Sequence, residues 1–188
     1  MLVEVGISAR HIHISKKSLA ILFGEDYELH IFREVKQPGQ FGAEETVSVV
    51  GPKGSFPTVR ILGPIRAKDQ LEVSVSDCFK LGVKPMVRES GKIEGAPGIK
   101  LVGPKGEVEI NEGVIVAARH VHLSQVFADK EGIIDGQLLK AKIEGERALV
   151  FDNVIARISP DFVEEFHIDT DEANAALVRS GDKVTLIK

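Results

Sequence analysis

SARHIHIS at residues 8–15 and AARHVHLS at residues 117–124 are two copies of one eight-residue phrase. In each copy a strand-like run ends in Arg-His-x-His, and a serine then opens a short helical segment. The chain has six histidines, and these phrases contain four of them: His11, His13, His120 and His122. Because residues i and i+2 of a strand point to the same face, the two imidazoles of each copy are expected to project side by side.

A second, longer match shows that the repeat extends beyond these histidines. The segment FPTVRILGPIRAKDQLEVSVSD (56–77) aligns without gaps with FDNVIARISPDFVEEFHIDTDE (151–172). This alignment places Glu72 opposite His167, so each half offers two histidines and a third candidate ligand on a later strand. The spacing between the matched segments differs, and we place an insertion of the first half in the region 24–45. Two related halves predict two similar β-domains that face each other.

Short alternating runs separated by turn signals favour a mainly β fold with short capping helices. Runs with β-branched residues at alternate positions, such as VEVGI, TVRIL and KVTLI, lie between turn signals rich in glycine and proline. Many short strands of this kind predict a barrel or a sandwich. Helical candidates begin at Ser15, Ser124 and Thr170 and stop at glycines. The GPKG stretches at 51–54 and 103–106 predict hairpin turns.

Composition and charge exclude several classes of protein. The net charge of −4 argues against a general nucleic-acid binder, which normally carries a basic face. No apolar run approaches the roughly 20 residues of a membrane helix, and the N-terminus does not resemble a signal peptide. The single cysteine, Cys78, cannot form an internal disulfide, which suits a reducing cytoplasm. We expect Cys78 to be a small buried residue and not a nucleophile.

The candidate ligands form two sets of three: His11, His13 and Glu72, and His120, His122 and His167. Three protein ligands with an open fourth position are typical of catalytic zinc, although imidazole and carboxylate also suit cobalt or iron. If the halves face each other, two metals would flank one cleft, polarise a carbonyl and hold an anion. The competing interpretation is a structural repeat in which the histidines stack across strands without metal. The sixth histidine, His30, is interpreted as an ordinary loop or surface residue.

Three arginines need separate interpretations. Arg66 lies six residues before Glu72, and this even spacing places both on one face if the strand is unbroken. Its partner in the repeat is Asp161, and a cation that breaks the symmetry suggests a substrate with an oxyanion. An ordinary surface arginine is the alternative. Arg10 and Arg119 point away from the histidines that follow them, so we expect them to form structural ion pairs.

Taken together, these motifs resemble those of a known family. SARHIHIS, QPGQFGAEETV, RILGPIRAKDQLEVSVSD, GVIVAARHVHLS and FHIDTDEANAA are similar to stretches of the PduL-type phosphotransacylases, also called phosphate propanoyltransferases. The resemblance runs over essentially the whole chain. Two Arg-His-x-His phrases combined with the HIDTDEAN ending are a highly specific pattern.

The resemblance implies an activity, a cofactor and site residues. Family members transfer an acyl group, here expected to be acetyl or propionyl, reversibly between coenzyme A and inorganic phosphate. They use two Zn²⁺ ions between two β-barrels that share strands non-sequentially. The first barrel would comprise residues 1–9 and about 117–188, and the second about 10–116. The family's phosphate-binding arginine corresponds to Arg66, and its metal ligands correspond to all six candidates named above.

The resemblance also implies a setting. The partners would be acyl-CoA, coenzyme A and phosphate, without nucleic acid or membrane, and a homo-oligomer is compatible with the sequence. Members that enter bacterial microcompartments carry an N-terminal amphipathic extension. We see none ahead of the first strand-like run, and we therefore expect a free cytoplasmic enzyme of acetyl or propionyl metabolism, such as propanediol degradation. The rival interpretations are a two-metal hydrolase and a zinc-stabilised, non-catalytic β-barrel binding module.

Overall fold

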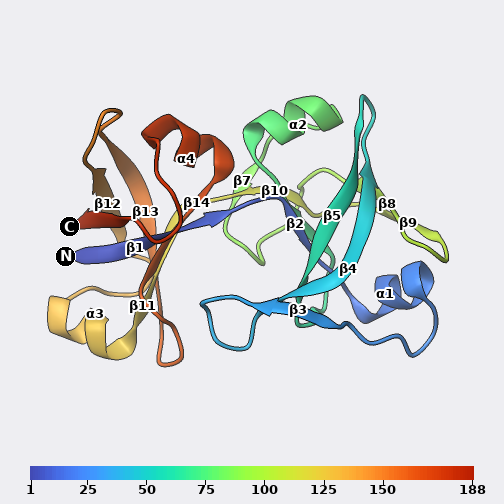
Figure 1. Cartoon of the computed structure of the whole chain (residues 1–188), viewed down its shortest axis with the longest axis horizontal. Coiled ribbons are helices and arrows are strands. Elements are labelled where there is room, and N and C mark those ends of the chain that lie inside the picture. Colours follow the sequence, from blue (N-terminus) through green and yellow to red (C-terminus); the bar gives the residue numbers. More distant parts are fainter. The chain divides into compact units, whose positions relative to one another are not determined.

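The structure is a computed structural model that describes residues 1–188, and it confirms the expectation of a mainly β protein with short helices. Strands account for 45% of the chain and helices for 15% (Figure 1). The chain divides into two compact units, each built on its own sheet and its own hydrophobic core. Unit 1 comprises Met1–Ala9 and Ala118–Lys188, and unit 2 comprises Arg10–Ala117.

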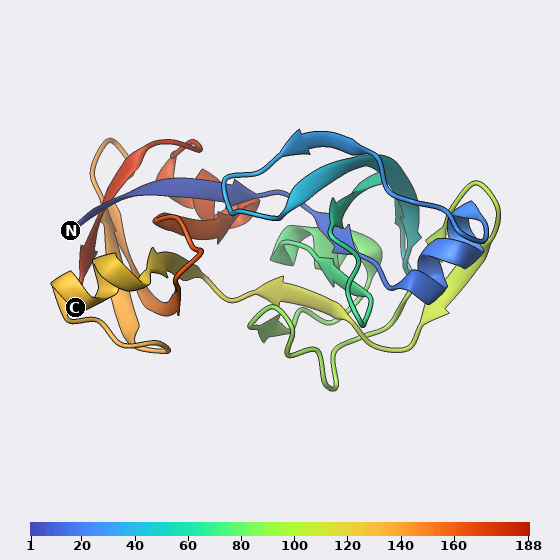
Figure 2. The ribbon, with the colours of Figure 1, turned by 90° about the horizontal axis from the view of Figure 1, so that it is seen from below.

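Unit 1 is a closed barrel of six strands. In barrel order they are β1 (Leu2–Ser8), β14 (Glu165–Asp169), β11 (His120–Ser124), β13 (Leu149–Ser159), β12 (Leu138–Ile143) and β15 (Lys183–Ile187). The N-terminal strand β1 and the C-terminal strand β15 pair antiparallel and close the barrel (Figure 2). Alternate residues fill its interior, such as Val3 and Val5 of β1 and Phe166 of β14, which are at most 2% exposed.

Unit 2 contains a nine-stranded sheet that curls into a half barrel. In sheet order its strands are β7 (Val87–Arg88), β10 (Val114–Ala117), β6 (Gln70–Glu72), β2 (His11–His13), β5 (Ser55–Gly63), β4 (Phe41–Val50), β8 (Ile99–Val102) and β9 (Glu107–Ile110), and β3 (Ile31–Glu34) pairs with β4 off this path. Strand β3 falls within the expected insertion 24–45. Both GPKG stretches form the predicted hairpin turns, closed by 2.9 Å bonds from Gly51 N–H to Gly54 O and from Gly103 N–H to Gly106 O.

The two sheets share one strand order. The run β1-β14-β11-β13-β12-β15 of unit 1 matches the run β10-β6-β2-β5-β4-β8 of unit 2, and each pair of neighbours has the same parallel or antiparallel sense. Strand β1 precedes the first histidine pair but belongs to unit 1, and β10 precedes the second pair but belongs to unit 2. The sequence repeat is therefore a repeat of topology, in which the two halves exchange their leading strands.

Serine caps and glycine stops predicted two helices correctly. Helix α1 (Lys16–Phe23) begins after Ser15, whose hydroxyl accepts the N–H of the third residue beyond it, and ends at Gly24. Helix α3 (Gln125–Glu131) begins after Ser124 in the same way and ends at Gly132. None of the four helices has the length and apolar content that crossing a membrane requires.

The other two helices differ from expectation. Helix α2 (Val75–Leu81) was not predicted, because VSVS at 73–76 alternates as a strand does. Its start is a capping box between Ser74 and Asp77, a signal that outweighs the alternation. Helix α4 (Thr170–Ala176) was predicted, but its cap is Asp169 and not Thr170, and it ends at Leu177, ahead of the expected glycine.

Arg10 and Arg119 form the structural ion pairs expected of them. Arg10 donates to both carboxylate oxygens of Asp77, at 3.0 and 2.8 Å. Arg119 Nε donates to Oε1 of Glu172 at 2.7 Å. Asp77 and Glu172 are equivalent in the sequence alignment, and each belongs to the capping box of a helix, α2 or α4. The repeat therefore preserves a link between each histidine phrase and the helix after the third-ligand strand.

Asp169→Ala is expected to lower the free energy of unfolding by about 1 kcal/mol, because its carboxylate caps α4 by accepting the N–H of Glu172. Thr170→Ala is the matched control, and its effect should stay within about 0.5 kcal/mol. Urea unfolding followed by circular dichroism measures both changes. A greater loss with Thr170→Ala than with Asp169→Ala would place the cap where the sequence alone suggested it.

Candidate metal centres

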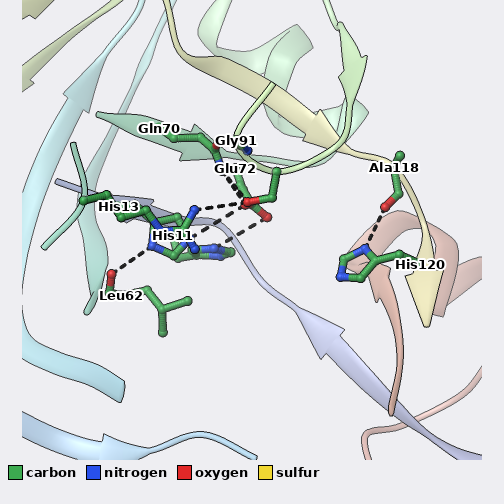
Figure 3. Close-up of polar contacts among 10 residues, drawn as sticks. His11, His13, Leu62, Gln70, Glu72, Gly91, Ala118 and His120 are labelled. Atoms are coloured by element: carbon green, nitrogen blue, oxygen red, sulfur yellow. Dashed lines mark hydrogen bonds and ion pairs between the residues drawn. The ribbon is translucent and has the colours of Figure 1, made fainter. Parts of the chain in front are cut away.

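Strands β2 and β6 bring the three candidates of unit 2 together, in what we call the Glu72 cluster (His11, His13 and Glu72). The strands pair antiparallel with His11 directly opposite Glu72. The Nε2 atoms of His11 and His13 lie 3.6 and 3.8 Å from the two carboxylate oxygens of Glu72 (Figure 3). The imidazole rings lie edge to face with centroids 5.0 Å apart. The three side chains thus point toward one common region.

His13 is held neutral and oriented. Its side chain is 2% exposed, and Nδ1 lies 2.9 Å from the carbonyl oxygen of Leu62. Because a carbonyl can only accept, Nδ1 carries the proton and Nε2 carries the lone pair. Burial lowers the pKa of His13 to about 3, and the neighbouring His11 and Arg66 add to this effect while Glu72 opposes it. A neutral imidazole with an oriented lone pair is the form that binds metals.

A hydrogen-bond network joins Arg66 to Glu72. The guanidinium Nη1 of Arg66 donates to Ser90 Oγ at 3.1 Å, and that hydroxyl donates to Oε1 of Glu72 at 2.9 Å. The side-chain amide of Gln70 donates to the same Oε1 at 2.7 Å, and its carbonyl oxygen accepts the N–H of Gly91 at 2.7 Å. The Glu72 carboxylate is therefore fixed by two donors, one of which also binds Arg66.

Arg66 lies at the cluster for a reason other than the one expected. Strand β6 comprises only Gln70–Glu72, so no unbroken strand carries Arg66 and Glu72 on one face. Arg66 instead forms an isolated bridge with Ser15, and its side chain reaches the cluster through Ser90. The even spacing in the sequence was a coincidence.

Strands β11 and β14 bring the candidates of unit 1 together, in what we call the His167 cluster (His120, His122 and His167). His120 lies directly opposite His167 in the antiparallel register. The three ring centroids lie 4.8 to 5.0 Å apart. Nδ1 of His120 lies 2.8 Å from the carbonyl oxygen of Ala118, which fixes its tautomer as Leu62 does for His13 (Figure 3).

His122 carries the clearest sign of a missing partner in the molecule. It is 4% exposed, packs against Phe162 with ring centroids 4.3 Å apart, and its buried Nδ1 has no hydrogen-bond partner. Burial lowers the pKa of His122 to about 2, with further lowering by His167 and His120. A buried polar atom without a partner costs about 1–3 kcal/mol, so a ligand at this nitrogen would remove a penalty.

The two clusters fit the requirements of a divalent cation. In each one, three ligand atoms lie within 4.8 Å of one another. Tetrahedral zinc with Zn–N distances of about 2.0–2.1 Å separates its ligand atoms by roughly 3.3 Å, so modest side-chain rotations would close either set on one ion. Antiparallel strand pairing places the candidate ligands of each cluster on two adjacent strands. Burial keeps His13 and His122 neutral.

Some residues beside the clusters were not predicted. Gln70 and Ser90 contact Glu72, and Glu165 Oε2 lies 2.7 Å from His167 Nε2. Gln70 and Glu165 had a sequence signal, because each stands two residues before the third candidate ligand of its half. Ser90 lies outside the matched segments and had none.

His30 belongs to neither cluster, as expected of a loop or surface residue. It lies outside the strands, its side chain is 64% exposed, and Nδ1 lies 2.7 Å from Oε1 of Glu45. This hydrogen bond raises the pKa of His30.

Comparisons with known proteins show a match that covers both clusters. The model of the phosphate propanoyltransferase family matches residues 4–179. The chain is 49% identical over 185 residues to a phosphate propanoyltransferase of Thermotoga maritima, and the alignment covers 98% of this chain and 88% of the relative. It is 47% identical over 186 residues to one of Listeria monocytogenes, covering 99% and 87%. For one of Clostridioides difficile the values are 41% over 186 residues, covering 99% and 89%.

In metal-free protein His13 and His122 should stay neutral from about pH 8 to about pH 5, because burial holds both pKa values far below 6.5. His30 is the internal control, since its hydrogen bond to Glu45 raises its pKa above 6.5. The ¹⁵N-NMR shifts of the imidazole nitrogens measure each titration.

The same shifts give the sign of the pH dependence of stability. Below about pH 6.5 the unfolded chain binds protons at these two histidines and the native chain does not, so the free energy of unfolding decreases as the pH is lowered. Above that pH both states hold neutral rings. Ordinary titration of His13 and His122 near pH 6.5 in the folded protein would contradict this account.

Proposed function

The chain belongs to the phosphate propanoyltransferase family and is a phosphate acyltransferase, and from this premise we propose that it transfers an acyl group reversibly between coenzyme A and inorganic phosphate. We take the acyl group to be propionyl, in keeping with the name that the relatives carry, or acetyl. These groups differ by one methylene, worth about 1–3 kcal/mol in a pocket, so one site can accept both.

Two divalent cations, taken here as Zn²⁺, would be held by the Glu72 cluster and the His167 cluster. The observation that supports this most directly is the convergence of three ligand atoms in each cluster, within 4.8 Å of one another. The buried, unpartnered Nδ1 of His122 supports it independently. When bound, such ions would polarise the thioester carbonyl and neutralise charge on phosphate and on the departing thiolate.

Arg66 is the residue that we assign to phosphate. A guanidinium presents its N–H groups in a planar fork that matches two oxygens of a phosphate. Arg66 is half-buried, and its hydrogen bond to Ser90 holds it beside the Glu72 cluster. Because Arg66 lies beside the Glu72 cluster, we assign phosphate to that cluster.

The transfer needs positioning more than proton abstraction. A phosphate oxygen attacks the thioester carbonyl carbon, a C–O bond forms, and the C–S bond then breaks with its electron pair passing to the sulfur of coenzyme A. Phosphate is already an anion at neutral pH, so no strong general base is required. Arg66 would orient the attacking phosphate.

Incubation with acetyl-CoA or propionyl-CoA tests the proposed reaction. Free thiol and acyl phosphate should appear together, and only when inorganic phosphate is present. Thiol release at the same rate without phosphate would instead identify a two-metal hydrolase. An absence of turnover in zinc-loaded protein under both conditions would favour a binding module.

Arg66→Ala should raise the KM for phosphate and slow turnover by about 10²-fold or more, the scale of losing one charge-stabilising group. Arg33→Ala removes an exposed arginine of the same unit on β3 and should leave the kinetics unchanged. Initial rates at varied phosphate and saturating acyl-CoA separate KM from kcat. If phosphate kinetics are the same in both variants, Arg66 does not bind phosphate.

Cys78→Ala should retain nearly full activity, because the thiol lies in α2 at 1% exposure within the core of unit 2 and cannot reach a substrate. Direct transfer requires no acyl-enzyme. A single free thiol also suits the reducing cytoplasm in which we place the enzyme. Loss of turnover in a variant with an unchanged melting temperature would contradict direct transfer.

A further inference from the structure

Each pair of ligand-bearing strands has four positions on one face, one more than its three candidate ligands. On β11 and β14, His120 lies opposite His167, and His122 lies opposite Glu165. Residues directly opposed in an antiparallel ladder share a face, and so do residues i and i+2 of one strand. Glu165 therefore occupies the fourth corner of a square whose other corners are the His167 cluster.

Glu165 makes direct contact with one of the three histidines. Its Oε2 lies 2.7 Å from Nε2 of His167, and its side chain is 13% exposed. Because a carboxylate oxygen can only accept, Nε2 of His167 donates its proton and Nδ1 keeps its lone pair. A carboxylate at the far nitrogen of a ligating imidazole fixes the ring and its tautomer and increases its strength as a ligand.

The equivalent corner of unit 2 holds a neutral amide. Gln70 lies opposite His13 on the paired strands, and the gap-free alignment matches it to Glu165. Its amide donates to Oε1 of Glu72 at 2.7 Å, so the fourth corner again contacts the third ligand, two residues along the strand. In unit 2 the ligand is the carboxylate and its support is neutral, whereas in unit 1 these roles are exchanged. Each square thus contains one carboxylate.

Gly6 provides the space that the Glu165 carboxylate occupies. It lies opposite His167 on β1, and a Cβ atom built there would lie 2.7 Å from Cδ of Glu165. The topologically equivalent residue of unit 2 is Ile115, which lies opposite Glu72 and is fully buried. The position opposite the third candidate ligand therefore lacks a side chain in unit 1, where the supporting residue is a carboxylate, and carries one in unit 2, where it is an amide.

We propose that Glu165 is a positioning residue of the His167 cluster, which holds His167 through its Nε2 proton and supplies the one negative charge of that square toward a bound dication. Gln70 has the matching neutral role beside Glu72. The inference rests on the proposed function, because it requires a cation at the His167 cluster.

Zn²⁺ affinity, measured by competition with a chromophoric chelator, tests this role without recourse to activity. Wild-type protein should bind two ions, and Glu165→Gln should weaken one of them by roughly 10–100-fold, the usual loss for such a partner, and leave the other unchanged. Glu144→Gln removes an exposed carboxylate of the same unit that pairs with Lys142, and it should bind both ions as wild type does.

A change of background separates positioning from direct ligation. In a His167→Ala background the ring that Glu165 holds through Nε2 is absent, so adding Glu165→Gln should weaken Zn²⁺ binding much less than it does in the wild type. An equal loss of affinity from Glu165→Gln in both backgrounds would make Glu165 a ligand and overturn the positioning role.

Gly6→Ala perturbs the same carboxylate without changing any polar group. The added methyl should displace Glu165 and weaken the same ion, and unchanged affinity would contradict the proposal. Wild-type protein that binds no Zn²⁺ would remove the proposed metal sites together with this inference. Wild-type and Glu165→Gln proteins that bind two ions with equal affinity would overturn this inference alone.

Discussion

Antiparallel register between a His-x-His strand and the strand of the third ligand is the constraint on which both clusters depend. The residue between the histidines maintains it: Ile12 and Val121 are fully buried in the cores of their units. A slip of one residue would turn each histidine pair into the core and expose the apolar residue between them. Burial of such a side chain is worth about 1.5–3 kcal/mol, so core packing itself fixes the face on which the imidazoles lie.

The repeat preserves the supports of this register and changes the groups at the clusters. Asp69 and Glu164 are equivalent in the alignment, and each accepts the backbone N–H of the last serine of a phrase, Ser15 or Ser124. The arginine of each phrase likewise forms an ion pair with the acid of a capping box, that of α2 or that of α4. The halves differ at the third candidate ligand, at its support and at Arg66, which are the positions to which we assign different roles in the two units.

The sequence predicted what depends on local, periodic signals. Alternation predicted the β class, serine and glycine predicted α1 and α3, and the duplicated phrase with its alignment predicted which six side chains form the two clusters. It did not predict α2, because VSVS fits a strand by alternation and a helix by its capping box. Ser90 and the path of Arg66 depend on a loop that only the tertiary fold brings to Glu72, and no local pattern records such a contact.

An anomalous-difference map, recorded at the absorption edge of the metal from a crystal of the protein as purified, tests the central claim most directly. The account predicts two peaks per chain, one about 2.0–2.2 Å from nitrogen and oxygen atoms of His11, His13 and Glu72, and one about 2.0–2.1 Å from nitrogens of His120, His122 and His167. A map of catalytically active protein with no peak at either cluster would contradict it.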